Sequence, residues 1–360
     1  MKTTLHFKIV TILLILPLFV FSSGWNGKHT KEKKINKEFD VSSSATLKVD
    51  NSYGDLDVTT WNENRIVIEV TISTNGNNLE KVQNKLDAID VEFNASSNSV
   101  SAKTRFNKNG KKSWWNWGNN NVNMKVNYVI KMPITNNVDF SNDYGSINLD
   151  KLEGHARLDC DYGKITTKEL MADNNDISFD YTKNSYFEYI KSGKINADYS
   201  GYTVAKTTNL DIDADYSKST IKIAEDVEYN CDYGSLTVEK VNNVTGDGDY
   251  LSLVLGDVYK NVDVKADYGS MKIDRMTSNA GDITVDSDYM KITIGYDSAY
   301  NFNFELNLGY ASFRNDGDLE ISKQNVKSSK KYYSGYHGNS NSGNNININS
   351  TYGSVTIKRN

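Results

Sequence analysis

Proline and cysteine are almost missing from this chain of 360 residues, which contains only two of each. Pro17 lies in an apolar N-terminal stretch, so Pro133 is the only proline in the remainder. Proline interrupts the hydrogen-bond ladders of helices and sheets, and its scarcity permits long uninterrupted secondary structure. Because apolar residues alternate along most of the chain and helix formers are few, we expect that structure to be β-sheet.

Histidine and arginine are also scarce, and this limits the enzyme classes that the sequence supports. Of four histidines, only His155 and His337 lie beyond the N-terminal 30 residues, and neither accompanies a Ser or Cys motif. The sequence has no His-Glu zinc motif, nucleophile elbow or phosphate loop. The six arginines are scattered, whereas polysaccharide-acting β-solenoids cluster carboxylates with Arg or Lys. We therefore predict a protein that is not an enzyme, with a polysaccharide-acting enzyme as the less favoured alternative.

The chain has no apolar run long enough to span a bilayer, which takes about 20 residues. The run at 9–21 follows Lys2 and Lys8 and precedes the small residues 22–24, as in a secretory signal peptide. We predict that residues 1–24 are such a signal and that the protein is exported to the periplasm, the outer surface or the medium. Removal of the two lysines would move the net charge from -5 to -7, which argues against nucleic acid as a partner.

Tyrosine is abundant, and its spacing shows an internal repeat. From Tyr144 to Tyr310 a tyrosine recurs every 17 to 21 residues, and the next follows 42 residues later. This tyrosine ladder comprises Tyr144, Tyr162, Tyr181, Tyr199, Tyr216, Tyr233, Tyr250, Tyr268, Tyr289, Tyr310 and Tyr352. The first nine follow an aspartate, which gives an aspartate ladder of Asp143, Asp161, Asp180, Asp198, Asp215, Asp232, Asp249, Asp267 and Asp288.

Each repeat has the pattern of two short strands joined at a corner. Apolar or small residues lie six, four and two positions before the tyrosine, and three and five after it, so the buried parity switches at the corner. We assign the extra residue to the Gly-Ser pair, where residues such as Gly145 and Gly163 can take a positive φ. One such unit cannot bury its apolar face, but stacked units can. The repeat therefore predicts an all-β fold, a β-solenoid with 17–21 residues per rung, since propeller blades need about 40–45.

The two cysteines test this stacking. Cys160 and Cys231 both lie two residues before a ladder tyrosine, four repeats apart. Stacking would separate them by roughly 19 Å, and a disulfide needs Cα atoms within about 7 Å. We predict two buried free thiols in a slot that Ala197, Ala214 and Ala266 fill in other repeats.

The N-terminal part is less regular than the repeats. Residues 25–44 form a basic segment that we expect to be a flexible lead-in, and residues 45–135 form an N-terminal β region. Within that region Tyr53 to Val58 matches the repeat and predicts a first rung. Apolar residues at helical spacing predict one short helix over Asn78–Ala88, which we expect to cover the open end of the stack. The solenoid repeats then occupy residues 136–360.

Two insertions interrupt this plan. Trp114, Trp115 and Trp117 stand in a polar segment, either as a hairpin tip folded back on the protein or as an exposed platform for a glycan or a protein. Residues 315–345 are rich in Ser, Gly, Lys and Asn and predict a mobile excursion before the last rung.

The aspartate ladder would place like charges about 5 Å apart, which needs compensation. In one interpretation each carboxylate accepts backbone N–H groups of the turn, with Lys164, Lys183, Lys218 and Lys291 balancing charge. In the other the ladder binds Ca²⁺. We favour the first, because the Gly-rich nonapeptide of calcium-binding solenoids is absent, and we expect no other cofactor.

The segments Tyr53–Val58, Tyr128–Pro133 and Asn345–Ile357 together resemble the DUF4097 family of adhesins and are similar to the head domain of autotransporter adhesins. This resemblance spans most of residues 45–360. It implies a single-stranded right-handed β-helix at the cell envelope and carries over no functional residue. We predict a non-catalytic surface protein that binds a glycan or a protein. The alternative is a periplasmic structural or stress-linked scaffold without an external ligand.

Overall fold

The computed structural model describes residues 25–106 and 122–360. The predicted signal peptide and the three clustered tryptophans, Trp114, Trp115 and Trp117, lie outside these described residues. The described residues form 28 strands and one helix, which confirms the all-β prediction. No helix among them is long and apolar enough to cross a membrane.

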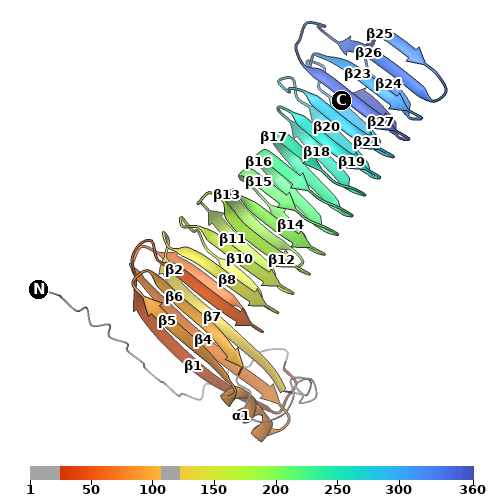
Figure 1. Cartoon of the computed structure of the whole chain (residues 1–360). Helices are drawn as coiled ribbons and strands as arrows, with labels where there is room; N and C mark the ends of the chain where they lie inside the picture. The colour runs from red at the N-terminus through yellow and green to blue at the C-terminus, as the bar shows by residue number, and fades with distance from the viewer. Residues whose placement is uncertain (1–24, 107–121) are drawn as a thin grey trace, which may run out of the picture. The chain divides into compact units, whose positions relative to one another are not determined.

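The chain divides into two compact units, residues 1–172 and 173–360 (Figure 1). In unit 1 the elements are β1 (His29–Asp40), β2 (Thr46–Ser52), β3 (Leu56–Trp61), β4 (Arg65–Gly76), α1 (Leu79–Asp87), β5 (Ile89–Ser96), β6 (Ser99–Phe106), β7 (Val122–Pro133), β8 (Asn137–Asp143), β9 (Ser146–Leu149), β10 (Ala156–Asp161) and β11 (Lys164–Leu170).

Unit 1 contains two columns of strands, one on each side of the tyrosine corners. The column before the corners has the order β5-β6-β2-β8-β10, and the column after them has the order β1-β4-β7-β3-β9-β11. Rung-to-rung pairs are parallel, whereas β5–β6, β1–β4 and β4–β7 are antiparallel. Because β2 and β3 pair with β8 and β9 in the repeat register, the first rung predicted around Tyr53 is confirmed.

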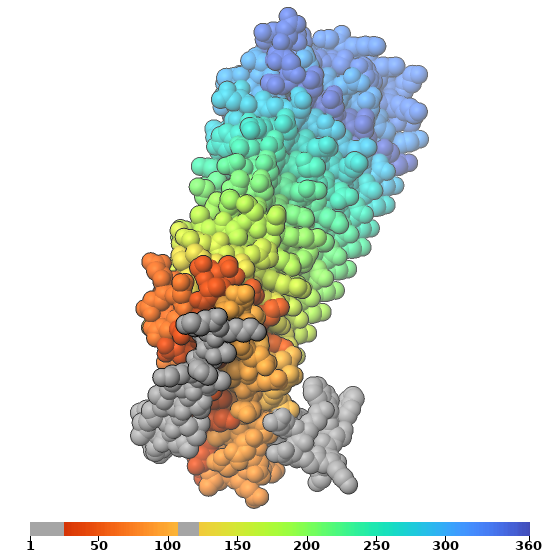
Figure 2. Space-filling view, turned by 60° about the vertical axis from the view of Figure 1, so that its left-hand side comes forward, coloured from red at the N-terminus to blue at the C-terminus, as the bar shows by residue number. Residues whose placement is uncertain are grey.

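Unit 2 carries the more regular repeats. Its strands are β12 (Asn175–Asp180), β13 (Ser185–Asp198), β14 (Gly201–Val204), β15 (Thr207–Asp213), β16 (Lys218–Asn230), β17 (Ser235–Asp247), β18 (Ser252–Val258), β19 (Val262–Asp267), β20 (Ser270–Met276), β21 (Ile283–Asp288), β22 (Lys291–Tyr296), β23 (Phe302–Gly309), β24 (Ser312–Asp316), β25 (Glu320–Val326), β26 (Lys330–His337), β27 (Asn345–Thr351) and β28 (Ser354–Arg359). The space-filling view shows the colour changing from green to blue as the chain passes from rung to rung (Figure 2).

Successive rungs of unit 2 pair in parallel and in register. Ile212, for example, lies opposite Ile195 on one side and Tyr229 on the other. Residues of like position thus stack in rows, and the inward rows of Val, Ile and Leu form the buried core. This parallel register excludes a meander or a propeller, and the handedness of the winding stays a prediction.

The chain order of the last rungs differs from the simplest expectation. Strand β27 pairs in parallel with β21 on one side and with β23 on the other. The rung of Tyr352 therefore lies between those of Tyr289 and Tyr310, which explains the gap of 42 residues in the tyrosine spacing. The intervening chain forms β25 and β26, and β26 pairs antiparallel with the far edge of β23.

Two predictions of irregular chain are wrong. The lead-in at 25–44 contains β1, which pairs antiparallel with β4 along its whole length, from His29 opposite Gly76 to Asp40 opposite Arg65. The excursion at 315–345 contains the β25–β26 hairpin. Both segments cover strand edges of a parallel ladder, and an uncovered edge exposes unpaired N–H and C=O groups. Polar composition therefore marked edge-covering strands here and not mobile chain.

The predicted helix is confirmed as α1, with Asn78 as its N-cap and Ala88 as its C-cap. The Asn78 side chain accepts a hydrogen bond from the Lys81 N–H, which satisfies one of the unpaired donors of the first turn. Val82 and Leu86 are buried, and the helix packs mainly on β4, β1 and β7. Its expected role as an end cover stays a prediction.

The corner itself differs from the predicted geometry. The positive φ belongs to the tyrosine in every rung, at 52° to 66°, and Gly145 and Gly163 are not among the glycines with positive φ. The extra residue is the Asp-Tyr pair: Asp249 and Tyr250 both point outward, between the buried Gly248 and Leu251. The glycines serve close approach instead, since a Cβ on Gly163 would lie 1.8 Å from the carbonyl oxygen of Gly145.

Cys160 and Cys231 are both buried and free, as predicted. Burial raises the pKa of each thiol to about 12, which keeps both protonated. Ala197, Ala214 and Ala266 are buried at the same position of their rungs, so the small-residue slot is confirmed.

Candidate functional site

The tyrosine ladder forms one row of stacked rings within each unit. In unit 1, Tyr53 and Tyr144 lie 5.2 Å apart between ring centroids, and Tyr144 and Tyr162 lie 5.0 Å apart. In unit 2 nine rings follow one another at 4.7 to 5.1 Å with interplanar angles of 1° to 10°. Their order is Tyr181, Tyr199, Tyr216, Tyr233, Tyr250, Tyr268, Tyr289, Tyr352 and Tyr310.

Each ladder tyrosine holds a backbone conformation that costs an L-residue about 1–2 kcal/mol. Hydrogen bonds between rungs hold this corner: the Tyr199 N–H donates to the Asp215 carbonyl at 3.0 Å, and the Tyr216 N–H to the Asp232 carbonyl at 2.9 Å. Glycine would adopt the same φ without strain. A stacked aromatic pair contributes about 0.5–1.5 kcal/mol beyond the area it buries. The stack therefore offsets the strain of the corner, and the ring is the part of the residue that glycine could not supply.

The stacking decides which part of each ring faces the solvent. Internal ladder rings are about half exposed, for example 48% at Tyr233, but their faces are covered by the neighbouring rings. What remains open is a row of ring edges and hydroxyl groups. No protein hydrogen bond within the described residues reaches the hydroxyls of Tyr199, Tyr216, Tyr233, Tyr250, Tyr268, Tyr289, Tyr310 or Tyr352.

The two ends of the ladder are finished differently. The edge of Phe106 packs on Tyr53 at 6.0 Å and 88°, so both sides of Tyr53 have an aromatic neighbour. Tyr310 stacks only on Tyr352 among the described residues and is the most exposed ring of the ladder, at 62%. Tyr310 thus offers an open ring face that no internal ladder ring has.

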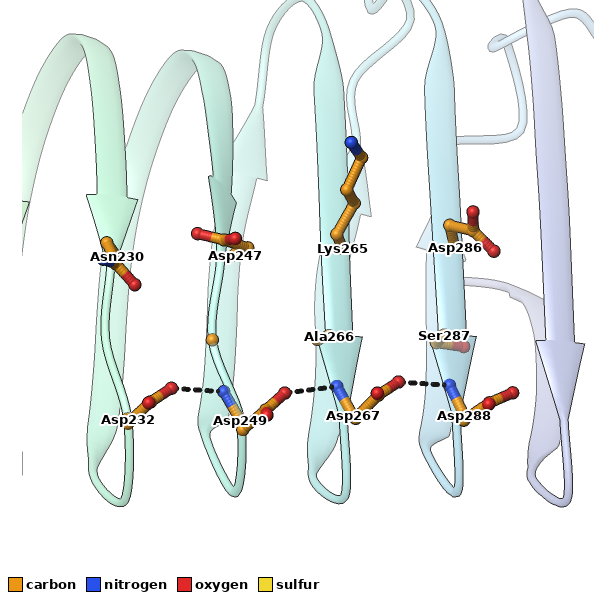
Figure 3. A pocket seen from close by; sticks show the side chains of 11 residues that line it. Asn230, Asp232, Asp247, Asp249, Lys265, Ala266, Asp267, Asp286, Ser287 and Asp288 are labelled. Carbon is orange, nitrogen blue, oxygen red and sulfur yellow. Dashed lines mark hydrogen bonds between the residues drawn. The ribbon is translucent and has the colours of Figure 1, made fainter.

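The aspartates form a hydrogen-bonded ladder beside the tyrosines in unit 2 (Figure 3). Each carboxylate accepts the backbone N–H of the aspartate on the next rung, as Asp232 does from Asp249 at 2.6 Å and Asp249 from Asp267 at 3.1 Å. The same bond occurs in every step from Asp180 to Asp288. This supports the predicted backbone role, although the donor lies in the next rung and not in the same turn.

Charge on this ladder is not balanced by the lysines that the sequence suggested. None of Lys164, Lys183, Lys218 and Lys291 makes an ion pair with a ladder aspartate, because the described lysines pair with other carboxylates, such as Lys194 with Asp213. Within the described part of the chain no group of three or more His, Cys, Asp or Glu has the arrangement of a metal site. Calcium binding along the ladder stays a prediction.

A shallow groove of about 430 Å³ runs beside the aspartate ladder (Figure 3). Its floor is made by Gly248, Ala266 and Ser287, and its walls carry six carboxylates and Lys265. Figure 3 places Asp247, Lys265 and Asp286 in one row and the ladder aspartates in another. The small residues of the floor are those of the cysteine and alanine slot, so the repeat itself hollows this surface.

Ionisation in the ladders is shifted by neighbours of like charge. Burial, followed by the adjacent tyrosines and aspartates, raises the pKa of Tyr233 and of Tyr268. In unit 1, burial and the charges of Asp161 and Asp50 raise the pKa of Asp143. The phenols of Tyr233 and Tyr268 therefore stay protonated donors at neutral pH.

Unit 1 contains a buried polar network that sequence reasoning missed. Asn51 donates to the Asn142 side-chain oxygen at 3.0 Å and to the Val126 carbonyl at 3.1 Å, and Thr104 donates to Asn51 at 2.8 Å. The Tyr128 hydroxyl lies 2.8 Å from the Thr104 hydroxyl. Asn51 and Asn142 stand two residues before a ladder tyrosine, so an asparagine in that slot was the available signal.

The remaining candidates have structural surroundings. The His337 ring is buried, stacks on Phe302, and places its Nδ1 2.8 Å from the Tyr300 carbonyl oxygen. His155 lies in unit 1, in the turn between β9 and β10. The tryptophan platform at 114, 115 and 117 lies outside the described residues and stays a prediction.

Comparisons with known proteins give distant likenesses only. No protein-family model matches the chain, and no curated protein matches it, so the resemblance to the DUF4097 family stays a prediction. A solved structure described as a "putative adhesin" from Parabacteroides distasonis shares 12% identity over 93% of this chain and 98% of its own, with a TM-score of 0.31. A "putative lipid binding protein" from the same species shares 11% identity over 91% and 96%, with a TM-score of 0.31. A "putative cell adhesion protein" from Clostridium sporogenes shares 10% identity over 92% and 100%, with a TM-score of 0.19.

Proposed function

We propose that this chain is an exported, non-catalytic binding protein of the cell envelope, and that the tyrosine ladder of unit 2 is its contact surface. The observation that carries the proposal is the row of half-exposed tyrosines in a strained backbone conformation. Strain that persists at many equivalent positions points to a use for the side chain that requires it. Tyrosine also suits an exposed contact surface, because it combines a large apolar body with a polar tip.

The geometry of the ladder narrows the kind of contact. Sugars stack on aromatic faces, and the internal rings have their faces covered, so a glycan would have ring edges and hydroxyls to bind, or the open face of Tyr310. A protein surface can accept hydrogen bonds from a row of hydroxyls spaced at 4.7 to 5.1 Å. This favours a protein partner for the ladder, while a glycan remains the partner of choice for a tryptophan platform at 114–117.

The experiment compares binding by four versions of the purified protein on glycan arrays and in cell-adhesion assays. The ladder variant changes Tyr216, Tyr233, Tyr250 and Tyr268 to Phe, which keeps the stack and removes the hydroxyls. A second variant changes the three tryptophans to Ala. The matched control changes Tyr186 and Tyr259, which are exposed outside the ladder, to Phe.

Loss of binding by the ladder variant alone, at an unchanged melting temperature, is the expected result. Loss by the tryptophan variant alone would move the binding surface to the insertion. Absence of binding by the unmodified protein would contradict the proposal and favour the structural scaffold. Surface proteolysis of whole cells separates these two, because only a protein on the outer surface is cleaved.

A further inference from the structure

We propose that the tyrosine ladder is a site of oxidative cross-linking, in which one-electron oxidants join tyrosines of neighbouring rungs as dityrosine within a single chain. The substrate class is a phenol pair, and the co-reactant is an external one-electron oxidant, such as a peroxidase intermediate or a photogenerated metal complex. This proposal does not depend on the binding function proposed above.

The first requirement is proximity. Two phenoxyl radicals couple only when they meet, and neighbouring ladder rings lie 4.7 to 5.1 Å apart in unit 2 with their planes within 10°. Parallel strands in register set this distance, because like positions of successive rungs repeat at the strand spacing. Holding two reacting groups together makes their reaction effectively unimolecular, so coupling within the chain should outrun coupling between chains.

The second requirement is access for the oxidant. The rings of Tyr233, Tyr250 and Tyr268 are 46% to 49% exposed, and their edges carry the ring carbons next to the hydroxyl. These hydroxyls make no protein hydrogen bond in the described structure, so no internal partner holds the phenol proton. In contrast Tyr128, Tyr296 and Tyr300 are fully buried and out of reach.

The third requirement is freedom to bond. Ladder side chains stand at the corners on the outer surface, and rotation about their Cα–Cβ and Cβ–Cγ bonds can turn two stacked rings until their ortho carbons meet. The Cα atoms stay on adjacent rungs throughout, held by bonds such as that from the Tyr216 N–H to the Asp232 carbonyl at 2.9 Å.

The step balances as follows. Each of two tyrosines gives one electron to the oxidant and its hydroxyl proton to water, and each becomes a phenoxyl radical. One carbon–carbon bond forms between the ring carbons ortho to the two oxygens. The hydrogen on each of these carbons then transfers to the oxygen of its own ring, which restores both phenols. Two oxidant molecules are reduced by one electron each.

The test uses three full-length proteins exposed to photo-oxidised tris(bipyridine)ruthenium with persulfate, at several protein concentrations. The alternating variant changes Tyr144, Tyr199, Tyr233, Tyr268 and Tyr352 to Phe, so that in each unit no two ladder tyrosines remain adjacent. The matched control changes Tyr186, Tyr189, Tyr259, Tyr332 and Tyr336 to Phe, which removes as many phenols and leaves the ladder intact. Dityrosine fluorescence gives the rate, and mass spectrometry of proteolytic fragments gives the joined residues.

We expect the unmodified protein and the control to form dityrosine at a rate independent of protein concentration, with cross-links such as Tyr216 to Tyr233. The alternating variant should lose this signal. Equal dityrosine from the alternating variant, cross-links only between chains, or fragments joined outside the ladder would each overturn the proposal. If the alternating variant fails to fold, the fragment map of the unmodified protein still decides.

Discussion

Unit 1 and unit 2 share one corner geometry but pack it differently. In unit 1 the residue after each tyrosine is glycine in all three rungs, and a Cβ on Gly54, Gly145 or Gly163 would lie 1.8 to 2.0 Å from a carbonyl oxygen of the neighbouring rung or strand. In unit 2 the same position holds Thr182, Ser200, Ser217, Leu251 and Met290 as well as glycine. There the glycines leave slightly more room, 2.4 Å at Gly234 and 2.3 Å at Gly269.

The small slot before the tyrosine differs in the same way. In unit 1 it holds Asn51 and Asn142, which are joined by a buried hydrogen bond, and in unit 2 it holds mostly Ala, Gly and Ser. A buried amide must find specific partners, whereas a small apolar residue needs only space. The comparison teaches that unit 1 is specified by particular contacts and unit 2 by repetition of one pattern.

The largest expected effect is at the tight corner of unit 1. Gly163→Ala should lower the free energy of unfolding by about 3 kcal/mol, because the new Cβ forces the backbone of two rungs apart. Gly234→Ala in unit 2 should cost less, since Ser, Thr and Leu occupy the equivalent position in its neighbours. Gly201→Ala is the control, because a Cβ there would meet nothing within 4 Å. Denaturant unfolding measures all three, and equal losses at Gly163 and Gly234 would remove the difference between the units.

A smaller effect is expected where strain and stacking oppose each other. Tyr233→Ala keeps the positive φ and loses two ring neighbours, so unfolding should become about 1–3 kcal/mol easier. Tyr233→Gly should recover about 1–2 kcal/mol of that loss, because glycine takes this φ without strain. Tyr310→Ala loses only one ring neighbour and should cost about half as much as Tyr233→Ala. If Ala and Gly at position 233 gave the same stability, the corner would not be strained.

The smallest effect is expected from alkaline pH. The pKa values of Tyr233 and Tyr268 are raised in the folded protein, so the folded state holds these phenol protons more tightly than the unfolded chain does. Their contribution to stability is complete below the unfolded pKa of about 10 and is lost as the pH rises through the folded values. Absorbance titration of tyrosine, together with unfolding at several alkaline pH values, checks this. The variant with Phe at 144, 199, 233, 268 and 352 should lose less stability in alkali, and an equal loss would place the effect elsewhere.

Much of the fold could be predicted because the tyrosine spacing records the stack directly. Period-two burial around each tyrosine gave the strands, Asn78–Ala88 gave the helix, and the stacking placed Cys160 and Cys231 as buried free thiols. The errors have one cause: polarity was read as mobility. His29–Asp40 and the β25–β26 hairpin are polar because they cover sheet edges with one side in water.

The sequence by itself determined that residues of like position would stack in rows, because only stacking buries a face that recurs every 17 to 21 residues. It could not decide the backbone conformation within a corner, and the strain fell on the tyrosine and not on the glycine, since the glycine is needed for close approach to the next rung. It also could not decide the order of the last rungs, which depends on β27 pairing with both β21 and β23. Pairing between distant segments and the room left around a Cβ are properties of packed neighbours, and only the tertiary structure fixes them.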